Sequence, residues 1–317
     1  MHKIQLIAVS ALTLLAAACS QQGPSDSTAP AAAPSAAVAS GSGPKTIGLA
    51  LSTQNNPFFV ELKDGAQKEA AADGYTLTIV DAQDDPAKQI SSVEDLIQKK
   101  VSVILLNPTD SSALIGAVKQ ANAAHIPVIT LDRSVSGGTV VSHIASDNVA
   151  GGAEAANYLI KALNNKGNVI ELQGVPGTSA ARERGQGFDD VIKTSGLKII
   201  AQQPANFDRA QGLSVTENLL QGHADVQAIF AQNDEMALGA VRALDGAKRA
   251  NVLVVGFDGT PDGLQAVKDG KIAAIVAQQP GMIGQLGVKA AKSVMEGQTV
   301  EAKIAVPLKL VTKDSAP

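Results

Sequence analysis

The sequence predicts an α/β protein made of two doubly wound parallel-sheet lobes. Strand-like and helix-like patterns alternate from about Lys45 onward, which indicates parallel sheets covered by helices. The strand-like segments are continuous apolar runs, typical of strands buried on both faces. Because one open sheet of usual size would not hold so many strands, we expect two sheets, with a break near Ser146-Asp147.

The first series of elements precedes this break. Pro57 suits the first turn of a helix, and Ile90, Val93, Leu96 and Ile97 have helical spacing. We expect strands at 46–51, 77–80, 101–106 and 128–131, and helices at 57–72, 86–99 and 111–123.

The second series repeats the alternation after the break. We expect helices at 148–163, 180–194, 208–221, 235–244, 262–268 and 282–295. The strands expected between them are 168–172, 198–201, 226–231, 252–257 and 273–277, with a final extended stretch at 304–311. No internal sequence repeat is obvious by eye.

The N-terminal segment has the features of an export signal. A short positive start is followed by an apolar stretch that ends in small residues and Cys19, so residues 1–18 are predicted to be a signal peptide of the lipoprotein type. Cys19 is the single cysteine of the chain, and we expect it to be the lipid attachment point. Residues 19–44 are rich in Ala, Pro, Ser and Gly and predict a flexible tether. The expected location is the periplasm or cell envelope, with the chain anchored to a membrane.

Composition and missing motifs exclude several function classes. The formal charge of −4, without a basic cluster, argues against nucleic acid as a partner. Common nucleotide, metal and nucleophile-elbow motifs do not occur, so no cofactor, metal or catalytic residue is predicted. His125, His143 and His223 stand alone in the sequence and are expected to be structural or exposed.

Polar residues follow the apolar strands at their carboxyl ends, the edge at which open α/β sheets bind ligands. A carboxylate accepts hydrogen bonds from adjacent hydroxyls, and a guanidinium donates in a planar fork. Asp132 with Arg133 therefore suits vicinal hydroxyls, and Asp258 could act similarly from the other lobe. The amides and the hydroxyl at the other strand ends can donate and accept; they are Ser52, Asn56, Asn107, Asn233 and Gln278.

Aromatic residues and one further arginine complete the candidate site. Phe58, Phe59 and Phe207 stand in polar segments although aromatic residues make up only 3% of the chain. Their rings could cover the C–H faces of a sugar. Arg184, near the start of a helix, would reach the cleft, whereas Glu171 inside an apolar strand is interpreted as a structural hydrogen-bonding residue. Together these features predict binding of a small, neutral, hydroxyl-rich molecule.

Several of these segments closely resemble the ribose-binding members of the periplasmic binding protein family, which serve bacterial ABC transport systems. The resemblance runs from about Lys45 to Lys313. The segments that carry it are Ser-Thr-Gln-Asn-Asn-Pro-Phe-Phe (52–59), Asn-Pro-Thr-Asp (107–110), Thr-Leu-Asp-Arg (130–133), Ser-His-Ile-Ala-Ser-Asp-Asn (142–148), Thr-Ser-Ala-Ala-Arg-Glu-Arg-Gly (178–185), Phe-Ala-Gln-Asn-Asp-Glu-Met-Ala-Leu-Gly (230–239) and Val-Gly-Phe-Asp-Gly-Thr-Pro-Asp-Gly (255–263).

The resemblance implies a ligand site, a lobe division and partners. It places ribose contacts on Ser52, Asn56, Phe58, Phe59, Asn107, Asp132, Arg133, Arg184, Phe207, Asn233, Asp258 and Gln278. It implies a three-stranded hinge with crossovers near 146–147, 278–279 and 307–308. The N-terminal lobe would then be 45–146 plus 279–307, and the C-terminal lobe 147–278 plus 308–317. The expected partners are a sugar and the membrane permease of an ABC importer. We expect a monomer, and contact with a chemoreceptor stays open.

Three alternative functions remain beside this reading. A sugar-responsive repressor of the same fold would carry an N-terminal helix-turn-helix where this chain has a signal and tether. In an exported sugar-processing enzyme, Asp132 and Asp258 could form a glycosidase pair, but Arg133 should keep Asp132 ionised, which suits binding better than acid catalysis. The third alternative keeps the transport role and changes the ligand to another pentose, a furanose or a signalling sugar.

Overall fold

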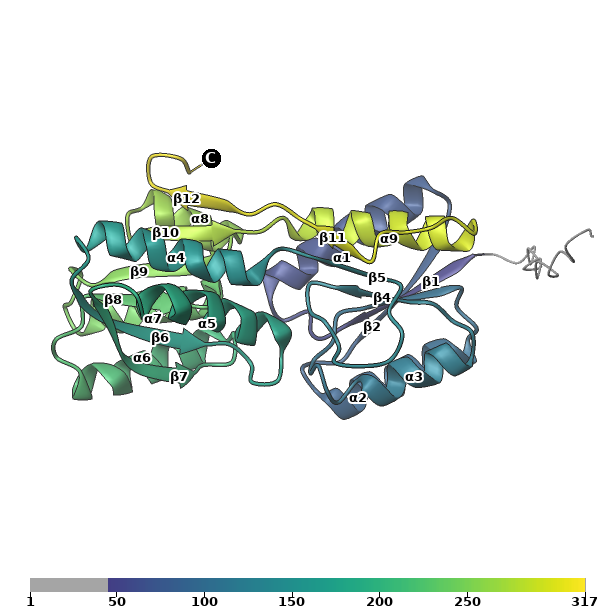
Figure 1. The fold of residues 1–317 in the computed structure, drawn as a ribbon, viewed down its shortest axis with the longest axis horizontal. Helices are drawn as coiled ribbons and strands as arrows, with labels where there is room; N and C mark the ends of the chain where they lie inside the picture. The colour runs from purple at the N-terminus through teal and green to yellow at the C-terminus, as the bar shows by residue number, and fades with distance from the viewer. Residues whose placement is uncertain (1–44, 317) are drawn as a thin grey trace, which may run out of the picture. The chain divides into compact units, whose positions relative to one another are not determined.

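The computed structural model describes residues 45–316, in which helices and strands alternate around two sheets (Figure 1). The predicted signal peptide, the tether and Cys19 lie outside the described residues. Within 45–316, no helix combines the length and apolar character needed to cross a bilayer.

The first sheet has six strands in the order β11-β5-β4-β3-β1-β2, and all its pairings are parallel. The order β2-β1-β3-β4-β5 is that of a doubly wound sheet, whose ligand crevice lies where the winding reverses, between β1 and β3. The strands are β1 (Thr46–Leu51), β2 (Thr76–Asp81), β3 (Val103–Leu106), β4 (Val128–Leu131), β5 (Ser142–Ala145) and β11 (Lys303–Ala305).

The second sheet repeats this arrangement in the order β12-β10-β9-β8-β6-β7. Here the winding reverses between β6 and β8, and only the edge strand β12 is antiparallel. The strands are β6 (Gly167–Gln173), β7 (Leu197–Pro204), β8 (Ala228–Ala231), β9 (Leu253–Asp258), β10 (Ala274–Ala277) and β12 (Lys309–Thr312). We call the elements around the first sheet the first lobe, and those around the second sheet the second lobe.

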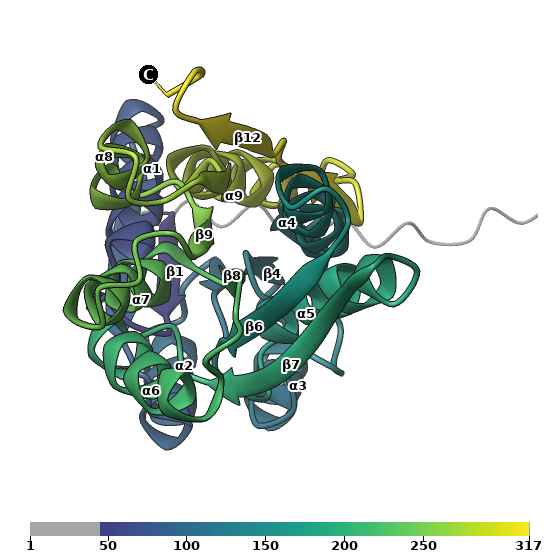
Figure 2. The same cartoon turned by 90° about the vertical axis from the view of Figure 1, so that its left-hand side faces the viewer.

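Helices cover both faces of each sheet, as Figure 2 shows for the second lobe. On β1, alternate residues face opposite cores: Leu49 packs in the core with α1 and α9, and Ala50 in the core with α2 and α3. On β8, Ile229 and Phe230 divide in the same way between the core with α6 to α8 and the core with α4 and α5. The helices are α1 (Pro57–Ala72), α2 (Pro86–Gln98), α3 (Ile115–Ala123), α4 (Asn148–Ala162), α5 (Ser179–Ile192), α6 (Arg209–Gly222), α7 (Asp234–Gly246), α8 (Pro261–Lys268) and α9 (Pro280–Met295).

The predicted fold class is confirmed, with differences at three elements. β5 was not expected, because Ser142-His143-Ile144-Ala145 is short and half polar; it forms a strand because β4 and β11 pair with it on both sides. The single extended stretch expected at 304–311 is wrong: it is two strands, β11 and β12, in different sheets. α3 begins at Ile115 rather than at Ser111, and Ser111 makes contacts of another kind, described below. The residue boundaries proposed for the lobes stay a prediction.

Candidate functional site

Two aspartates end strands at the carboxyl edges of the two sheets. Asp132 follows β4 of the first lobe and Asp258 ends β9 of the second, and their exposed fractions are 3% and 4%. Their φ angles are +62° and +111°. Positive φ is costly for a residue with a Cβ, and such strain concentrates at functional sites, where surrounding structure enforces it. The two buried carboxylates therefore mark these strand ends as a candidate site.

Each aspartate has an arginine beside it, but the two arginines differ in their bonding. Arg184 donates from Nε to Asn148 Oδ1 (2.9 Å) and from Nη1 to the Gln232 carbonyl (2.7 Å) and Asp258 Oδ1 (3.2 Å). Arg133 Nε lies 3.8 Å from Asp132 Oδ2, which is a charge contact without a hydrogen bond. The Arg184 guanidinium is thus hydrogen-bonded to protein acceptors, whereas Nε of Arg133 has no hydrogen-bond acceptor.

Aromatic rings surround the arginines. The Cζ atom of Arg133 lies 5.0 Å from the ring centre of Phe59 and 5.4 Å from that of Phe207, within the range of cation–π attraction. Phe207 also lies 5.7 Å from Arg184 Cζ, so this ring of the second lobe contacts both guanidinium groups. Phe58 packs edge-on against Phe59 in the first turn of α1. That turn begins where the Asn56 side chain accepts a hydrogen bond from the Phe58 N–H (2.9 Å).

These side chains line a small cavity between the lobes. It combines carboxylates, guanidinium groups and amides with aromatic rings. The lining residues are Asn56, Phe58, Phe59, Asp132, Arg133, Ala180, Arg184, Phe207, Asn233 and Asp258.

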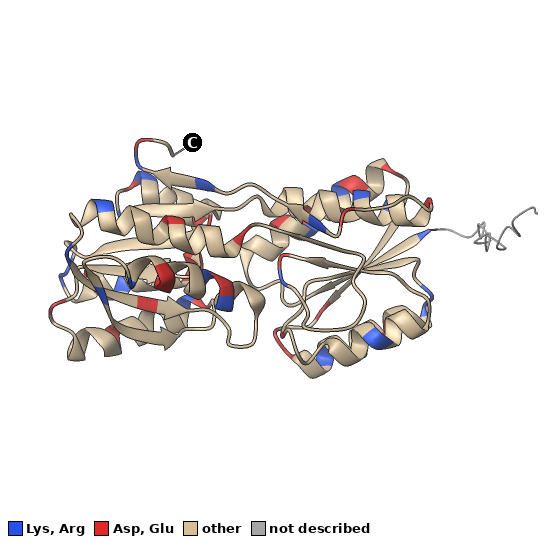
Figure 3. Ribbon diagram, viewed as in Figure 1, with Lys and Arg blue, Asp and Glu red and all other residues tan. Residues whose placement is uncertain are grey.

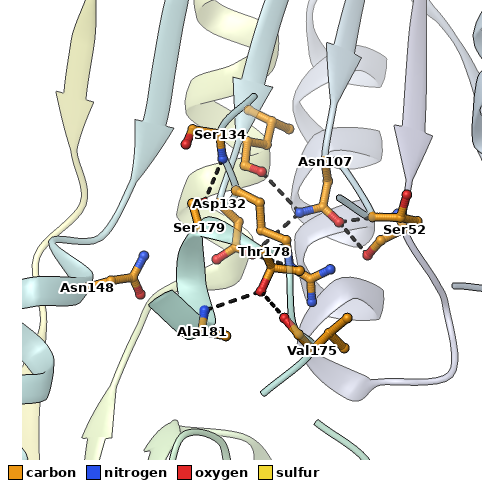
Figure 4. Close-up of polar contacts among 12 residues, drawn as sticks. Ser52, Asn107, Asp132, Ser134, Asn148, Val175, Thr178, Ser179 and Ala181 are labelled. Carbon is orange, nitrogen blue, oxygen red and sulfur yellow. Dashed lines mark hydrogen bonds and ion pairs between the residues drawn. The ribbon is translucent and has the colours of Figure 1, made fainter. Parts of the chain in front are cut away.

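Three predicted ligand contacts lie beside the carboxylates without lining this cavity. Asn107 donates from Nδ2 to the Leu131 carbonyl (3.1 Å) and toward Asp132 Oδ2 (3.4 Å), and its Oδ1 accepts from Ser52 Oγ (2.7 Å; Figure 4). Gln278 donates from Nε2 to Asp258 Oδ1 (3.0 Å). In this structure, Ser52, Asn107 and Gln278 position the carboxylates; direct contact of these three with a ligand stays a prediction.

Several buried polar atoms at the site have no hydrogen-bond partner in the protein. They are Asp132 Oδ1, Arg133 Nε and Gln278 Oε1, two acceptors and one donor. Leaving such a group unpaired costs about 1–3 kcal/mol, and more for a charged group. A ligand with hydroxyl groups could pair with all three, since a hydroxyl both donates and accepts.

Burial dominates the pKa shifts at the site. It raises the pKa of Asp132, against the opposing effect of Arg133, and raises the pKa of Asp258 to about 7, against the effect of Arg184. Burial also lowers the pKa of the Arg133 guanidinium. The sequence predicted that Arg133 keeps Asp132 ionised. The charge of Arg133 does lower the pKa of Asp132, but desolvation raises this pKa by more.

Sequence reasoning missed four residues that build the site. Ala180 lines the cavity from the first turn of α5. Asp234 accepts three hydrogen bonds from the Gly259–Thr260 turn that follows Asp258. Gly174 lies under Phe207, and its N–H donates to Gln232 Oε1 (2.8 Å). Gln232 and Asp234 are the sequence neighbours of the predicted Asn233. This proximity is the one sequence feature that could have indicated them as site residues.

Two structural expectations are confirmed. Glu171 accepts from Gln232 Nε2 (2.8 Å) and Gln202 Nε2 (2.6 Å), so it orients amides behind the site. His143 bonds through Nδ1 with Thr130 Oγ1 (2.9 Å), and burial lowers its pKa to about 4, so it is neutral at pH 7. Among residues 45–316, no group of three or more metal-ligating side chains is arranged to hold an ion.

The charged residues outside the site are of mixed sign. Figure 3 shows Lys and Arg interspersed with Asp and Glu over the helices of both lobes. This distribution agrees with the mildly acidic net charge of −4.

Comparison with known proteins identifies the family. A family model described as a periplasmic binding protein domain matches residues 47–299. The ribose import binding protein of Salmonella typhimurium is 59% identical over 84% of this chain and 90% of its own length, and that of Bacillus subtilis is 53% identical over 84% and 87%. An ABC transporter solute binding protein of Bacillus halodurans, solved with bound myo-inositol, superposes with a TM-score of 0.83 at 33% identity and covers 87% of this chain and 97% of its own. The chain therefore belongs to the periplasmic binding protein family.

Proposed function

We propose that this chain is the substrate-binding protein of a sugar ABC importer, and that it binds ribose in the cavity between its lobes and delivers it to a membrane permease. The observation that carries the proposal is the pair of buried strand-end carboxylates, Asp132 and Asp258, which face one small polar cavity from opposite lobes. The relatives that are 53% to 59% identical to this chain are ribose import binding proteins, and the chain is not an enzyme.

The proposed ligand contacts are the twelve residues expected from the resemblance. Nine of them line the cavity, and the remaining three hydrogen-bond to the carboxylates or to each other. Hydrogen bonds to charged groups contribute about 1.5–3 kcal/mol each, so several such bonds support affinities in the micromolar range or tighter. A sugar whose hydroxyl is wrongly placed would leave a buried carboxylate unpaired, which explains how such a site would select among epimers.

We further propose hinge closure with the lobe division 45–146 plus 279–307 and 147–278 plus 308–317. A ligand that contacts both lobes stabilises the closed form by its differential affinity for that form. The ring of Phe207 in the second lobe lies against the guanidinium of Arg133 in the first lobe. This contact supports a closed conformation of this kind.

The decisive test is titration calorimetry with ribose on the wild type, Asp132→Ala and Asp258→Ala. We expect binding by the wild type and a loss of about 2–4 kcal/mol in each variant, which corresponds to a dissociation constant roughly 30- to 1,000-fold higher. Asp245→Ala is the control, because this exposed residue pairs with Lys271 at the surface. Unchanged affinity in both site variants would refute the site. A parallel set of pentoses, furanoses and hexoses would show whether another sugar is preferred.

The periplasmic location follows from the family, and anchoring through a lipid on Cys19 is a proposal. Labelling with a radioactive fatty acid should mark the wild type and not Cys19→Ser. A monomeric state and contact with a chemoreceptor stay predictions.

A further inference from the structure

Two loops on opposite lobes contact each other directly beside the cavity. One contains Ser111 and Ser134 of the first lobe, and the other contains Gly177 and Ser179 of the second. The Ser111 N–H donates to the Gly177 carbonyl (3.0 Å), and the Ser134 N–H donates to Ser179 Oγ (2.9 Å). Figure 4 shows the second of these bonds next to Asp132. We call these four residues the interlobe latch.

Each side of the latch is held by bonds within its own lobe. Ser111 Oγ donates to the Ser134 carbonyl (2.8 Å), which joins the two serines of the first lobe. In the second lobe, Thr178 Oγ1 donates to the Val175 carbonyl (2.8 Å) and accepts from the Ala181 N–H (3.3 Å; Figure 4). The interlobe donors and acceptors are therefore already oriented when the lobes meet.

Glycine is the only residue type that fits at position 177. Its φ of +90° is unfavourable for residues with a Cβ, and a Cβ would lie 2.0 Å from Asp110 Oδ2 of the opposite lobe. The Asp110 carboxylate cannot easily turn away, because its Oδ1 accepts from the N–H groups of Ser112 and Ala113 (2.7 Å each). The close approach of the loops thus depends on the absence of a side chain.

We propose that this latch stabilises the closed conformation by itself and so sets the affinity for every sugar by a common factor. The proposal rests on the sugar-binding function and the lobe closure proposed above. None of the four latch residues lines the cavity, although Ser134 follows Arg133 and Ser179 precedes Ala180, which both do. When the binding-competent form is only partly populated, the apparent dissociation constant is the intrinsic one divided by that population. A contact that favours closure without touching the sugar therefore changes affinity and leaves selectivity unchanged.

The central test variant is Ser179→Ala. Ser179 is 1% exposed, so its removal leaves the Ser134 N–H without its acceptor in the closed form, whereas water can replace it when the lobes separate. We expect the dissociation constant to rise about tenfold for ribose and by the same factor for a weaker-binding sugar. Alanine at the first position of α5 suits a helix, so the fold should be retained. Ser214→Ala is the control, since Ser214 is an exposed serine of α6 whose hydroxyl bonds within its own helix.

A second variant and a sugar-free measurement make the test decisive. Gly177→Ala should raise the dissociation constant more than Ser179→Ala does, because the added Cβ meets Asp110. The distance between fluorophores on the two lobes, measured without sugar, should show a smaller closed population in both variants. Wild-type affinity and closed population in Ser179→Ala, or an altered ranking of sugars, would overturn the proposal. If the wild type bound no sugar, the proposed function would fail, while the distance measurement would still decide whether the latch favours closure.

Discussion

Each half of the cavity contains one aspartate and one arginine, but the hydrogen bonds of these residues differ between the two halves. In the second lobe, Asp258 accepts hydrogen bonds from Arg184 and Gln278, and Arg184 is held by two further acceptors. In the first lobe, one carboxylate oxygen of Asp132 has no hydrogen-bond partner, and Arg133 Nε has none either. The second half thus pairs its two charged groups within the protein and leaves the neutral amide oxygen Gln278 Oε1 unpaired, whereas in the first half both charged side chains keep an unpaired atom that a ligand could bind.

This difference indicates that the second half contributes more to fold stability and the first half more to ligand affinity. Bonds that exist without ligand stabilise the fold and add rigidity to the site, which lowers the entropic cost of binding. Unpaired buried groups destabilise the empty protein and strengthen binding, because the ligand relieves their desolvation cost. Substitutions in the two halves should therefore have different consequences.

The largest difference is expected between the two arginines. Arg184→Met removes the donor to Asn148, Gln232 and Asp258 and should lower the unfolding free energy by about 3–5 kcal/mol, as for a broken buried ion pair. Arg133→Met should change it by less than about 1 kcal/mol, because removing this poorly paired charge also removes a desolvation cost. Urea unfolding without sugar measures both. Equal losses in the two variants would contradict the comparison.

The next largest effect is a pH dependence of the unfolding free energy, which we expect from Asp258 in the second half. Burial raises the pKa of Asp258 from an ordinary value of 3.8 to about 7, so the folded protein keeps a proton that the unfolded chain releases. The stability that this proton contributes is present below pH 3.8 and is lost as the pH rises through 7. Between pH 4 and 8, the wild type should lose up to about 4 kcal/mol relative to Asp258→Asn.

Urea unfolding at several pH values tests this dependence, with Asp245→Asn as the exposed control. Parallel pH profiles for the wild type and Asp258→Asn would mean that the carboxylate is not buried in the sugar-free protein.

The smallest effect concerns the ring that contacts both arginines. A Cβ on Gly174 would lie 2.0 Å from Phe207 Cζ, so Gly174→Ala should displace this ring and weaken sugar binding by about 1–3 kcal/mol, the usual cost of overpacking. Arg133 should be affected more than Arg184, since Arg184 keeps its hydrogen bonds. Gly116→Ala is the matched control, because a Cβ there meets nothing within 4 Å. Calorimetric titration that shows the same affinity for both glycine variants would contradict the proposed role of Gly174.

Much of the fold could be predicted because its signals are local. Apolar runs such as Val103–Leu106 and Leu253–Asp258 form buried parallel strands, and helical spacing marks α2. The prediction failed where pairing partners decide the structure. Ser142–Ala145 is a strand only because it lies between β4 and β11, and residues 303–312 divide between two sheets.

The sequence by itself determined the α/β alternation and the polar residues at the strand ends, because periodicity and strand termini are properties of neighbouring residues. It placed Asp132, Arg133 and Asp258 at those ends without the tertiary structure. Only the tertiary structure decided which arginine is hydrogen-bonded, that Gly174 supports Phe207, and that Ser134 meets Ser179. Each of these depends on segments that are distant in sequence and come within bonding distance only when the sheets and helices pack.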